Sequence, residues 1–266
     1  MIALIAGRGR LPVALYDRLV AAGETVQLCE LQGQPSELDS AVGRLVFRLE
    51  RLGGLVARLK RRGVTRFCMA GGVDRPKINP LALDMATLRL LPRVRRALAP
   101  GDDGALRAII SVFEGAGIQV VAATEIAPDL LVGAGCPTRA EPEAGHRVLA
   151  MAGDRALDDM GAGDTGQSLI LGPDGVLATE GPEGTDALIG QARWPDGAVL
   201  FKGPKPGQDR RADMPTIGPA TAQNAVRAGL DGIIVEAGGV IVLDQPRVVE
   251  ILDAAGLFLW ARERPA

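Results

Sequence analysis

One segment of the chain, residues 202–218, gathers cationic and acidic side chains around three prolines. It contains the cations Lys202, Lys205 and Arg211 and the carboxylates Asp209 and Asp213. Because prolines interrupt helices, we expect an irregular loop that follows an apolar strand. Such cations hold phosphate oxygens, while carboxylates bind Mg²⁺ or Mn²⁺ or orient an attacking water. The alternative is an exposed loop whose charges only pair with one another.

Further polar side chains lie at other expected turns and helix ends. Gln167 comes just before an expected hairpin, and Thr185 and Asp186 begin an expected helix. Their oxygen atoms suit a hard cation, although Thr185 and Asp186 are also ordinary helix-capping residues. In the first half, Arg75 follows a glycine turn and is long enough to reach a phosphate. The acidic pair at 102–103 is explained equally well by helix capping.

The amino terminus has a glycine turn between an apolar strand and a helix. The turn reads Gly-Arg-Gly-Arg-Leu-Pro and contains Gly7, Gly9, Leu11 and Pro12. Such a turn lets backbone N–H groups approach a phosphate at the positive end of a helix. Glu30 stands about where dinucleotide-binding folds carry a ribose-binding acid. An NAD(P)-dependent oxidoreductase is therefore one alternative; a turn that holds another phosphate, or that only packs the helix, is the other.

Composition excludes several kinds of protein and of chemistry. The chain has 266 residues and a mass of 27.7 kDa, which favours two domains. Hydrophobic residues make up 47% and charged residues 23%, as in globular proteins, and no apolar stretch is long enough to span a bilayer. His146 is the only histidine, so acid-base chemistry and metal binding must rest on Asp, Glu and Lys. Cys29, Cys68 and Cys136 have no metal or disulfide spacing, which favours inert thiols.

Strands and helices alternate along the first half of the sequence. Expected strands cover residues 1–6, 25–31, 64–70 and 118–123. The segments between them include expected helices at 54–62, 81–98 and 103–114. Alternation of this kind favours a parallel sheet covered by helices. We therefore predict a Rossmann-like α/β domain over residues 1–130.

The second half begins after a stretch without periodicity. Residues 131–145 are rich in Gly, Pro and Glu and are predicted to be a linker. Residues 146–266 are predicted to form a smaller α/β domain that carries the charged loop. Its expected elements include a helix with His146 in the first turn, a hairpin around 172–175, and a strand at 198–201 before the loop.

Arginine is concentrated in the first half, in groups at 44–62 and 89–96. The usual explanation is a set of solvated helix faces. The sharper interpretation is attraction to a polyanionic surface, either anionic lipid headgroups or nucleic acid. Nucleic acid is disfavoured because aromatic residues make up only 3% and the pI is about 5.6.

The charged loop has a pattern that resembles a known family. Residues 202–218 read K-x-P-K-P-x-Q-D-x-R-x-D-x-P-T-I-G, which is similar to the UDP-2,3-diacylglucosamine pyrophosphatases of the LpxI type. The resemblance extends over nearly the whole chain, and the loop is its most specific part. The opening turn differs, because the family often has three consecutive glycines there, whereas Arg8 and Arg10 stand in this sequence.

The resemblance implies a Mg²⁺-dependent enzyme of lipid A biosynthesis. It would hydrolyse UDP-2,3-diacylglucosamine to 2,3-diacylglucosamine 1-phosphate (lipid X) and UMP, with the substrate between two domains. The family's essential aspartate matches Asp213. Whether that residue binds the cation or positions the water stays open, as do the number of metal ions, the phosphorus attacked and the acyl-chain preference.

The site residues expected on this basis fall into three groups. The catalytic residues are Asp213, Lys202, Lys205 and Arg211. The substrate-binding residues are Gly7, Gly9, Leu11, Arg75, Gln167, Thr185, Gln208 and Thr216. The metal ligands are Asp213, Asp209 and Asp186.

An acylated substrate and an arginine-rich first half together imply a location. We expect a cytoplasmic protein, peripheral on the anionic inner face of the inner membrane, with no nucleic-acid partner; a homodimer is left open. The competing hypotheses are the NAD(P)-dependent oxidoreductase and a non-catalytic protein that binds anionic surfaces. Stabilisation by NAD(P)H would favour the first, and indifference to replacement of Asp213 would favour the second.

Overall fold

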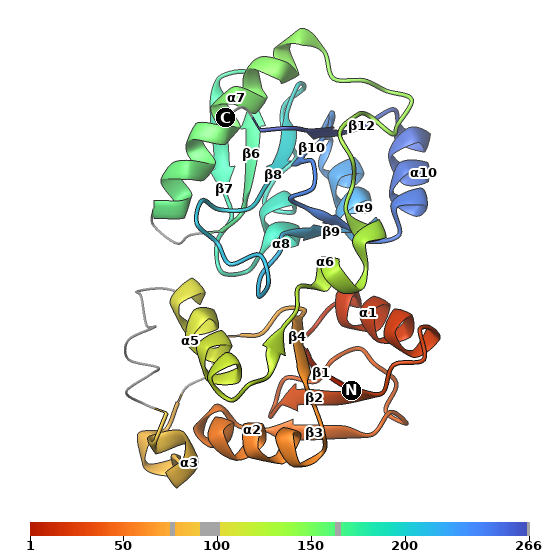
Figure 1. Cartoon of the computed structure of the whole chain (residues 1–266). Coiled ribbons are helices and arrows are strands. Elements are labelled where there is room, and N and C mark those ends of the chain that lie inside the picture. The colour runs from red at the N-terminus through yellow and green to blue at the C-terminus, as the bar shows by residue number, and fades with distance from the viewer. Residues whose placement is uncertain (75–77, 91–101, 163–165, 265–266) are drawn as a thin grey trace. The chain divides into compact units, whose positions relative to one another are not determined.

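The chain forms two α/β units, each built on its own five-stranded sheet (Figure 1). The computed structural model describes residues 1–74, 78–90, 102–162 and 166–264. Unit 1 consists of Met1–Pro128 and Asp209–Asp213, and unit 2 consists of Asp129–Gln208 and Met214–Ala266. The two units are equal in length. Five residues of the charged loop therefore group with the amino-terminal half of the sequence.

The sheet of unit 1 is entirely parallel. Its strands are β1 (Ile2–Ala6), β2 (Val26–Leu31), β3 (Arg44–Phe47), β4 (Arg66–Ala70) and β5 (Gln119–Val120). They lie in the order β3-β2-β1-β4-β5, which is the order of one common doubly wound α/β sheet. The predicted α/β class with a parallel sheet is confirmed.

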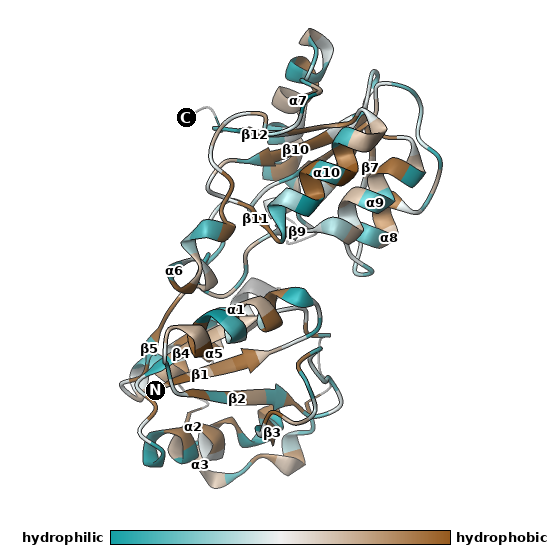
Figure 2. Cartoon of the chain, turned by 90° about the vertical axis from the view of Figure 1, so that its right-hand side faces the viewer, coloured by the Kyte–Doolittle hydropathy of each residue, from teal (hydrophilic) through white to brown (hydrophobic). Residues whose placement is uncertain are grey.

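Helices connect these strands. They are α1 (Arg10–Ala21), α2 (Leu52–Arg61), α3 (Met85–Leu88), α5 (Asp102–Gly115) and α6 (Ala123–Ile126), with the 3₁₀ turns η1 (Leu49–Arg51) and η2 (Pro80–Ala82). Apolar residues of α2 and α5 pack on one face of the sheet, where Phe67 of β4 and Phe113 of α5 stack with ring centroids 3.7 Å apart. Because a parallel sheet is covered on both faces, its central strand β1 is apolar along its whole length (Figure 2).

The sheet of unit 2 is mixed. Its strands are β6 (Ser168–Gly172), β7 (Gly175–Thr179), β8 (Val199–Lys202), β10 (Gly232–Glu236) and β12 (Phe258–Arg262), in the order β12-β10-β8-β6-β7. The strands β8, β10 and β12 are parallel, and β6 runs antiparallel to both β8 and β7. A separate two-stranded sheet pairs β9 (Thr216–Ile217) with β11 (Ile241–Val242). The predicted hairpin at 172–175 is the β6–β7 turn.

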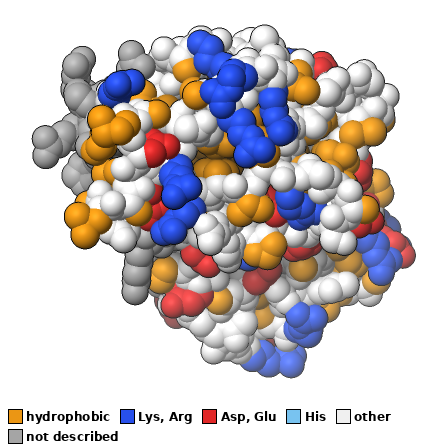
Figure 3. All heavy atoms as spheres, turned by 90° about the horizontal axis from the view of Figure 1, so that it is seen from below, with side chains coloured by type: hydrophobic (Ala, Val, Ile, Leu, Met, Phe, Trp, Pro, Cys, Tyr) orange, Lys and Arg blue, Asp and Glu red, His pale blue; other side chains and the backbone are white. Residues whose placement is uncertain are grey.

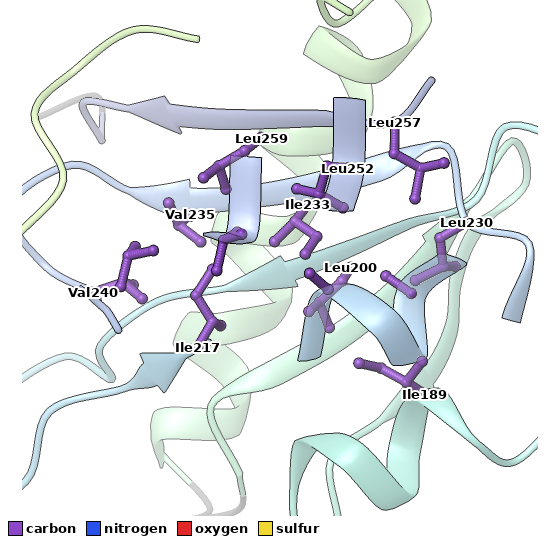
Figure 4. Packing of buried hydrophobic residues seen from close by; sticks show 14 of the residues in the cluster. Ile189, Leu200, Ile217, Leu230, Ile233, Val235, Val240, Leu252, Leu257 and Leu259 are labelled. Carbon is purple, nitrogen blue, oxygen red and sulfur yellow. The ribbon is translucent and has the colours of Figure 1, made fainter. Parts of the chain in front are cut away.

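Helices cover both faces of this sheet. They are α7 (Ala144–Ala162), α8 (Thr185–Ile189), α9 (Pro219–Ala228) and α10 (Gln245–Ala255), with the 3₁₀ turn η3 (Pro128–Leu130) before them. Successive side chains of a strand point to opposite faces. Leu200 and Ile233 pack against α8, α9 and α10 (Figure 4), whereas Phe201 and Ile234 pack against α7. This alternation fixes which face each polar residue at the strand ends occupies.

Residues 131–145, predicted as a linker, lie along unit 2. Leu131 forms an antiparallel bridge with Ile241, and Gly135 forms one with Ala261 of β12. The backbone N–H of Leu259 donates to the Oγ1 of Thr138 at 2.9 Å. The segment therefore extends the pairing of unit 2 despite its irregular composition.

Two expectations about the elements of unit 1 need correction. Arg44 was grouped with solvated helix faces, but it lies in β3, a strand that the sequence analysis did not predict, and forms an ion pair with Glu30. The helix expected over 81–98 begins as η2 and the four-residue α3, while 91–98 lie outside the described residues. No helix among the described residues is long and apolar enough to cross a membrane.

Candidate functional site

A buried lysine lies at the carboxyl end of β8. Only 6% of Lys202 is exposed, and its Nζ donates a hydrogen bond to the Oγ1 of Thr185 at 2.5 Å. The hydroxyl of Thr185 donates in turn to the Oε1 of Glu180 at 2.7 Å. The Oγ of Ser168 lies 3.0 Å from the same hydroxyl. We call Lys202, Thr185, Glu180 and Ser168 the Lys202 cluster.

The glycine turn before β6 completes this cluster. The backbone N–H of Gln167 donates to the Oε2 of Glu180 at 2.6 Å, and the N–H of Glu180 donates to the carbonyl of Ser168 at 2.9 Å. Gly166 adopts a φ of +47°, and a Cβ there would lie 2.6 Å from both the Cβ and the carbonyl oxygen of Glu180. Only glycine therefore fits this close approach of the turn to Glu180.

The environment of Glu180 favours its charged form. Burial alone would raise the pKa of this carboxyl, but the charge of Lys202 and the N–H of Gln167 outweigh it, with the hydroxyls of Thr185 and Ser168 adding to their effect. The net result is a pKa below the usual value. Lys202 thus faces an ionised partner inside unit 2.

Strand register brings these side chains to one edge. Ser168 is directly opposite Lys202 in the antiparallel β6–β8 pair, so the start of β6 lies beside the end of β8. Lys202 is two residues after Leu200 and shares its face, where α8 begins with Thr185. On the other face, a Cβ at Gly203 would lie 3.8 Å from the Cβ of Glu236, which ends β10. Carboxyl ends of strands in open α/β sheets are where ligands commonly bind.

Three residues predicted for the site lie close together in the structure, beside two that were not predicted. Lys202 was predicted as catalytic, and Gln167 and Thr185 as substrate-binding; all three meet in or beside the Lys202 cluster. Glu180 and Ser168 were not predicted. The hairpin shifts its register between Ile170 and Leu171, so counting back from the predicted turn would have placed Thr179, not Glu180, opposite Ser168.

The first part of the charged loop closes on itself. The backbone N–H of Lys205 donates to the Oε1 of Gln208 at 2.9 Å, and the N–H of Gln208 donates to the carbonyl of Lys205 at 3.2 Å. Thr216, which begins β9, donates its hydroxyl to the carbonyl of Met214 at 3.1 Å. Gln208 and Thr216 therefore shape the loop, while their binding of substrate stays a prediction.

The middle of the loop belongs to unit 1. Arg211 holds both carboxylate oxygens of Asp209, with its Nε 2.9 Å from Oδ1 and its Nη2 2.7 Å from Oδ2, and it forms an ion pair with Glu114 of α5 at 2.7 Å. These hydrogen bonds lower the pKa of Asp209 and raise that of Arg211. The N–H of Asp213 donates to the carbonyl of Asp209 at 3.2 Å, and Ala212 packs against the core of unit 1.

A three-carboxylate metal site is not assembled in the part of the chain that the structure describes. Within it, no group of three or more His, Cys, Asp or Glu side chains could hold a metal ion. Asp186 is exposed on α8 of unit 2, whereas Asp209 and Asp213 group with unit 1. Both oxygens of Asp209 bind Arg211. The role of Asp186, Asp209 and Asp213 as metal ligands stays a prediction.

The opening glycine turn is held by the chain itself. A Cβ at Gly7 would lie 2.4 Å from the carbonyl oxygen of Gly72, so the turn packs directly on a second glycine segment. The N–H of Gly9, at the start of α1, donates to the Oε1 of Glu37 at 3.1 Å, and Leu11 is buried. These three residues were predicted to bind substrate; that role stays a prediction, and Arg75 lies outside the described residues.

The features that suggested NAD(P) binding have other partners here. Glu30 is buried, accepts hydrogen bonds from the hydroxyl and N–H of Ser36, and forms an ion pair with Arg44 at 2.7 Å. Its carboxylate is thus used within unit 1, where a ribose-binding acid would face a ligand. The carboxylate of Glu37 also occupies the N–H of Gly9 at the start of α1, where a phosphate of a dinucleotide would bind. The geometry therefore does not favour NAD(P) binding.

His146, Cys29 and Cys68 lie in buried positions. His146 lies in the first turn of α7, as predicted, where its Nδ1 accepts a hydrogen bond from the N–H of Glu143 at 3.1 Å. Burial raises the pKa of the Cys29 and Cys68 thiols to about 12, so both stay protonated near neutral pH.

Comparison with known proteins decides the family. Residues 1–130 match the model of the LpxI N-terminal domain, and residues 133–260 match that of the LpxI C-terminal domain. The chain belongs to the LpxI family. A relative from Caulobacter vibrioides, the UDP-2,3-diacylglucosamine pyrophosphatase LpxI, is 36% identical over 98% of each chain. The resemblance inferred from the charged loop is therefore confirmed.

A search of solved structures adds nothing to the LpxI assignment. A putative NAD-dependent epimerase/dehydratase from Methylobacillus flagellatus is 17% identical to the chain, with a TM-score of 0.31. The comparison covers 99% of the LpxI chain and 83% of the other. This likeness is too low to bear on the fold or on the function.

Proposed function

We propose that this LpxI protein hydrolyses the diphosphate of UDP-2,3-diacylglucosamine to lipid X and UMP. Its membership of the LpxI family makes it a hydrolase of a pyrophosphate bond in lipid A biosynthesis. The observation that carries the proposal is the match to both LpxI domains, together with a pyrophosphatase relative that covers 98% of the chain.

The reaction needs charge neutralisation and an oriented water. A water oxygen bonds to one phosphorus of the diphosphate, the bond from that phosphorus to the bridging oxygen breaks, and the water gives up a proton. The bridging oxygen leaves on the other phosphate, so attack at either phosphorus gives the same products. No histidine is required, which suits a chain whose single histidine is buried in α7.

Cations of the charged loop neutralise the diphosphate in this proposal. Lys202 is held at the carboxyl edge of unit 2 by Thr185, and Arg211 is held in unit 1 by Asp209 and Glu114. Lys205, beside the turn closed by Gln208, is a third cation of the same loop. Fixed cations stabilise developing charge more effectively than mobile ones because they need no reorganisation during the reaction.

Asp213 is the proposed catalytic aspartate. It follows Ala212, which packs on the core of unit 1, and its N–H is bonded to Asp209, so its backbone is fixed. Its carboxylate either orients the water and accepts its proton or holds a divalent cation, Mg²⁺ or Mn²⁺, with phosphate oxygens of the substrate. Mg²⁺ sites of phosphate-transferring enzymes commonly combine one or two carboxylates with substrate phosphates. Such a cation supplies Lewis-acid neutralisation of the diphosphate.

The test is direct incubation of purified protein with UDP-2,3-diacylglucosamine, measuring UMP release. We expect UMP with Mg²⁺ or Mn²⁺ and a loss of release after chelation that either metal restores. Asp213→Asn should abolish turnover without lowering the melting temperature. Asp174→Asn, at the exposed tip of the β6–β7 hairpin, is the matched control and should keep full activity.

Two outcomes would contradict the proposal. If the wild-type protein releases no UMP under any metal condition, the hydrolase assignment is wrong for this substrate. If Asp213→Asn keeps wild-type turnover, the assignment of the catalytic aspartate is wrong while the reaction stands. Hydrolysis in water labelled with ¹⁸O identifies the phosphorus attacked, because the label enters either UMP or lipid X.

A further inference from the structure

Large apolar side chains are exposed together on η2 and α3 of unit 1. Leu81 is 97% exposed, Met85 66% and Ile78 57%, and Leu88 is exposed as well. We call Ile78, Leu81, Met85 and Leu88 the 78–88 patch. Single exposed apolar residues are normal on protein surfaces, but four within eleven residues mark an interaction surface.

The segment is fixed to unit 1 by its polar groups. The N–H of Asn79 donates to the Oε1 of Glu50, and the N–H of Asp84 donates to the carbonyl of the same residue, both at 3.0 Å. The N–H of Gly53 donates to the Oγ1 of Thr87 at 2.9 Å, and a Cβ at Gly53 would lie 2.4 Å from the backbone of Ala86. These hydrogen bonds and contacts fix the backbone of the segment to unit 1. Its apolar side chains therefore face solvent from an ordered backbone.

Exposed cations lie on the helix that packs against the 78–88 patch. The neighbouring helix α2 packs against α3, and exposed basic side chains lie on it or directly beside it. These side chains are Arg51, Arg58, Lys60, Arg61 and Arg62. Figure 3, which views the molecule from the side of α2 and α3, shows Lys and Arg side chains next to hydrophobic ones. Glu50, by contrast, is buried, and Asp84 caps α3 by accepting from the N–H of Thr87.

We propose that the 78–88 patch inserts into the surface of an anionic lipid bilayer while the cations of α2 contact its headgroups. Apolar side chains that enter the acyl boundary beside a basic helix face are the usual design of interfacial membrane binding. The inference rests on the proposed function, because an acylated substrate is drawn from a membrane. A second copy of this face is a poor partner, since symmetric pairing would bring the same cations together.

Vesicle binding by the full chain tests this surface without any substrate. Large unilamellar vesicles of phosphatidylcholine, with or without about one third phosphatidylglycerol, are sedimented with wild-type protein and two variants. Leu81→Ser with Met85→Ser should weaken binding to anionic vesicles at least tenfold. The control pair is Val148→Ser with Met151→Ser on α7, whose apolar side chains are 67% and 54% exposed. It should bind as wild type, because it lies outside the patch.

Charge and depth of insertion are measured separately. Replacing Arg58 and Arg61 by Gln should weaken binding by about fivefold per residue, and 0.5 M salt should remove this difference. In the Leu81→Trp variant, brominated lipids should quench the fluorescence of the introduced tryptophan, because position 81 enters the bilayer. Trp194 and Trp260 of the wild-type protein, both in unit 2, give the background quenching that this variant must exceed. This readout applies even if the double serine variant folds poorly.

The outcomes separate the membrane surface from the proposed reaction. Activity on substrate dispersed in detergent should be unchanged in the Leu81→Ser, Met85→Ser variant. Failure of the wild-type protein to release UMP overturns the proposed function, whereas vesicle binding is measured without it. Equal vesicle binding by wild type and patch variant, or a patch variant that changes only the oligomeric state in solution, overturns the membrane surface.

Discussion

The Nζ of Lys202 lies 2.5 Å from the Oγ1 of Thr185, the first residue of α8. The side chain of Lys202 is buried. The hydroxyl of Thr185 donates its own hydrogen bond to Glu180. A threonine thus stands between a cation and the carboxylate that balances it. Lys202, at the end of β8, thus meets side chains from the start of β6, from just after β7 and from the start of α8.

Removal of the Glu180 charge tests this arrangement. Glu180→Gln removes a carboxylate charge that faces the ammonium of Lys202, so we expect kcat/KM to fall at least tenfold and the alkaline limb of its pH profile to shift to lower pH. Breaking a fully buried ion pair costs roughly 3–5 kcal/mol; because Glu180 is half-buried, we expect about 2 kcal/mol by urea denaturation. Glu183→Gln, exposed three residues later, is the control. A lowered activity with an unchanged pH profile would mean that Glu180 acts only in folding.

The lowered pKa of Glu180 also predicts how stability depends on pH. Its pKa is below the usual value of 4.5 in the folded chain, so the unfolded chain binds the proton more readily. Its contribution is therefore complete above about pH 4.5 and is lost as pH falls through the folded pKa. The difference in unfolding free energy between wild type and Glu180→Gln should shrink between pH 6 and pH 3. A constant difference over that range would contradict this assignment.

The sequence identified part of the candidate site because that part has a local pattern. Lys202 follows a short apolar run, and Thr185 stands at a recognisable helix start, so both positions were predicted. Glu180 was missed because a single acidic residue after a strand has no distinctive spacing. Its role comes from hairpin register and from the close approach of Gly166, which only the folded chain shows.

The features that the sequence could not supply depend on contacts between distant residues. In strand β3, Leu45 and Phe47 are buried, but Val46 between them is apolar and exposed, so the sequence shows no alternation of polar and apolar residues there. The ion pair that holds Arg44 of this strand is with Glu30, fourteen residues earlier. Residues 131–145 have no periodicity because their order comes from pairing with β11 and β12. Asp209–Asp213 likewise group with unit 1 through contacts between distant residues, among them the ion pair between Arg211 and Glu114, which lie ninety-seven residues apart.

The contact between two glycine segments predicts a large effect of one added methyl group. Gly7→Ala would place a Cβ 2.4 Å from the carbonyl oxygen of Gly72, so the backbone must shift. We expect a loss of about 2–3 kcal/mol of unfolding free energy, in the range for overpacked sites. Gly72→Ala is the matched control: nothing lies within 4 Å of its added Cβ, and its stability should change by about 0.5 kcal/mol or less. Equal effects of the two variants would contradict the packing role of Gly7.

Nucleotide binding separates the pyrophosphatase from an oxidoreductase built on the opening turn. A ligand that binds only the folded chain raises its melting temperature according to its concentration relative to Kd. We expect UMP to raise the melting temperature and NADH and NADPH to leave it unchanged, because Glu37 takes the N–H of Gly9 and Glu30 is paired with Arg44. Glu37→Gln removes the negative charge that would compete with a phosphate at the start of α1. It should still not create NADH binding, because Glu30 stays paired with Arg44 and cannot bind the ribose. Stabilisation by NADH but not by UMP would instead assign the turn to a dinucleotide.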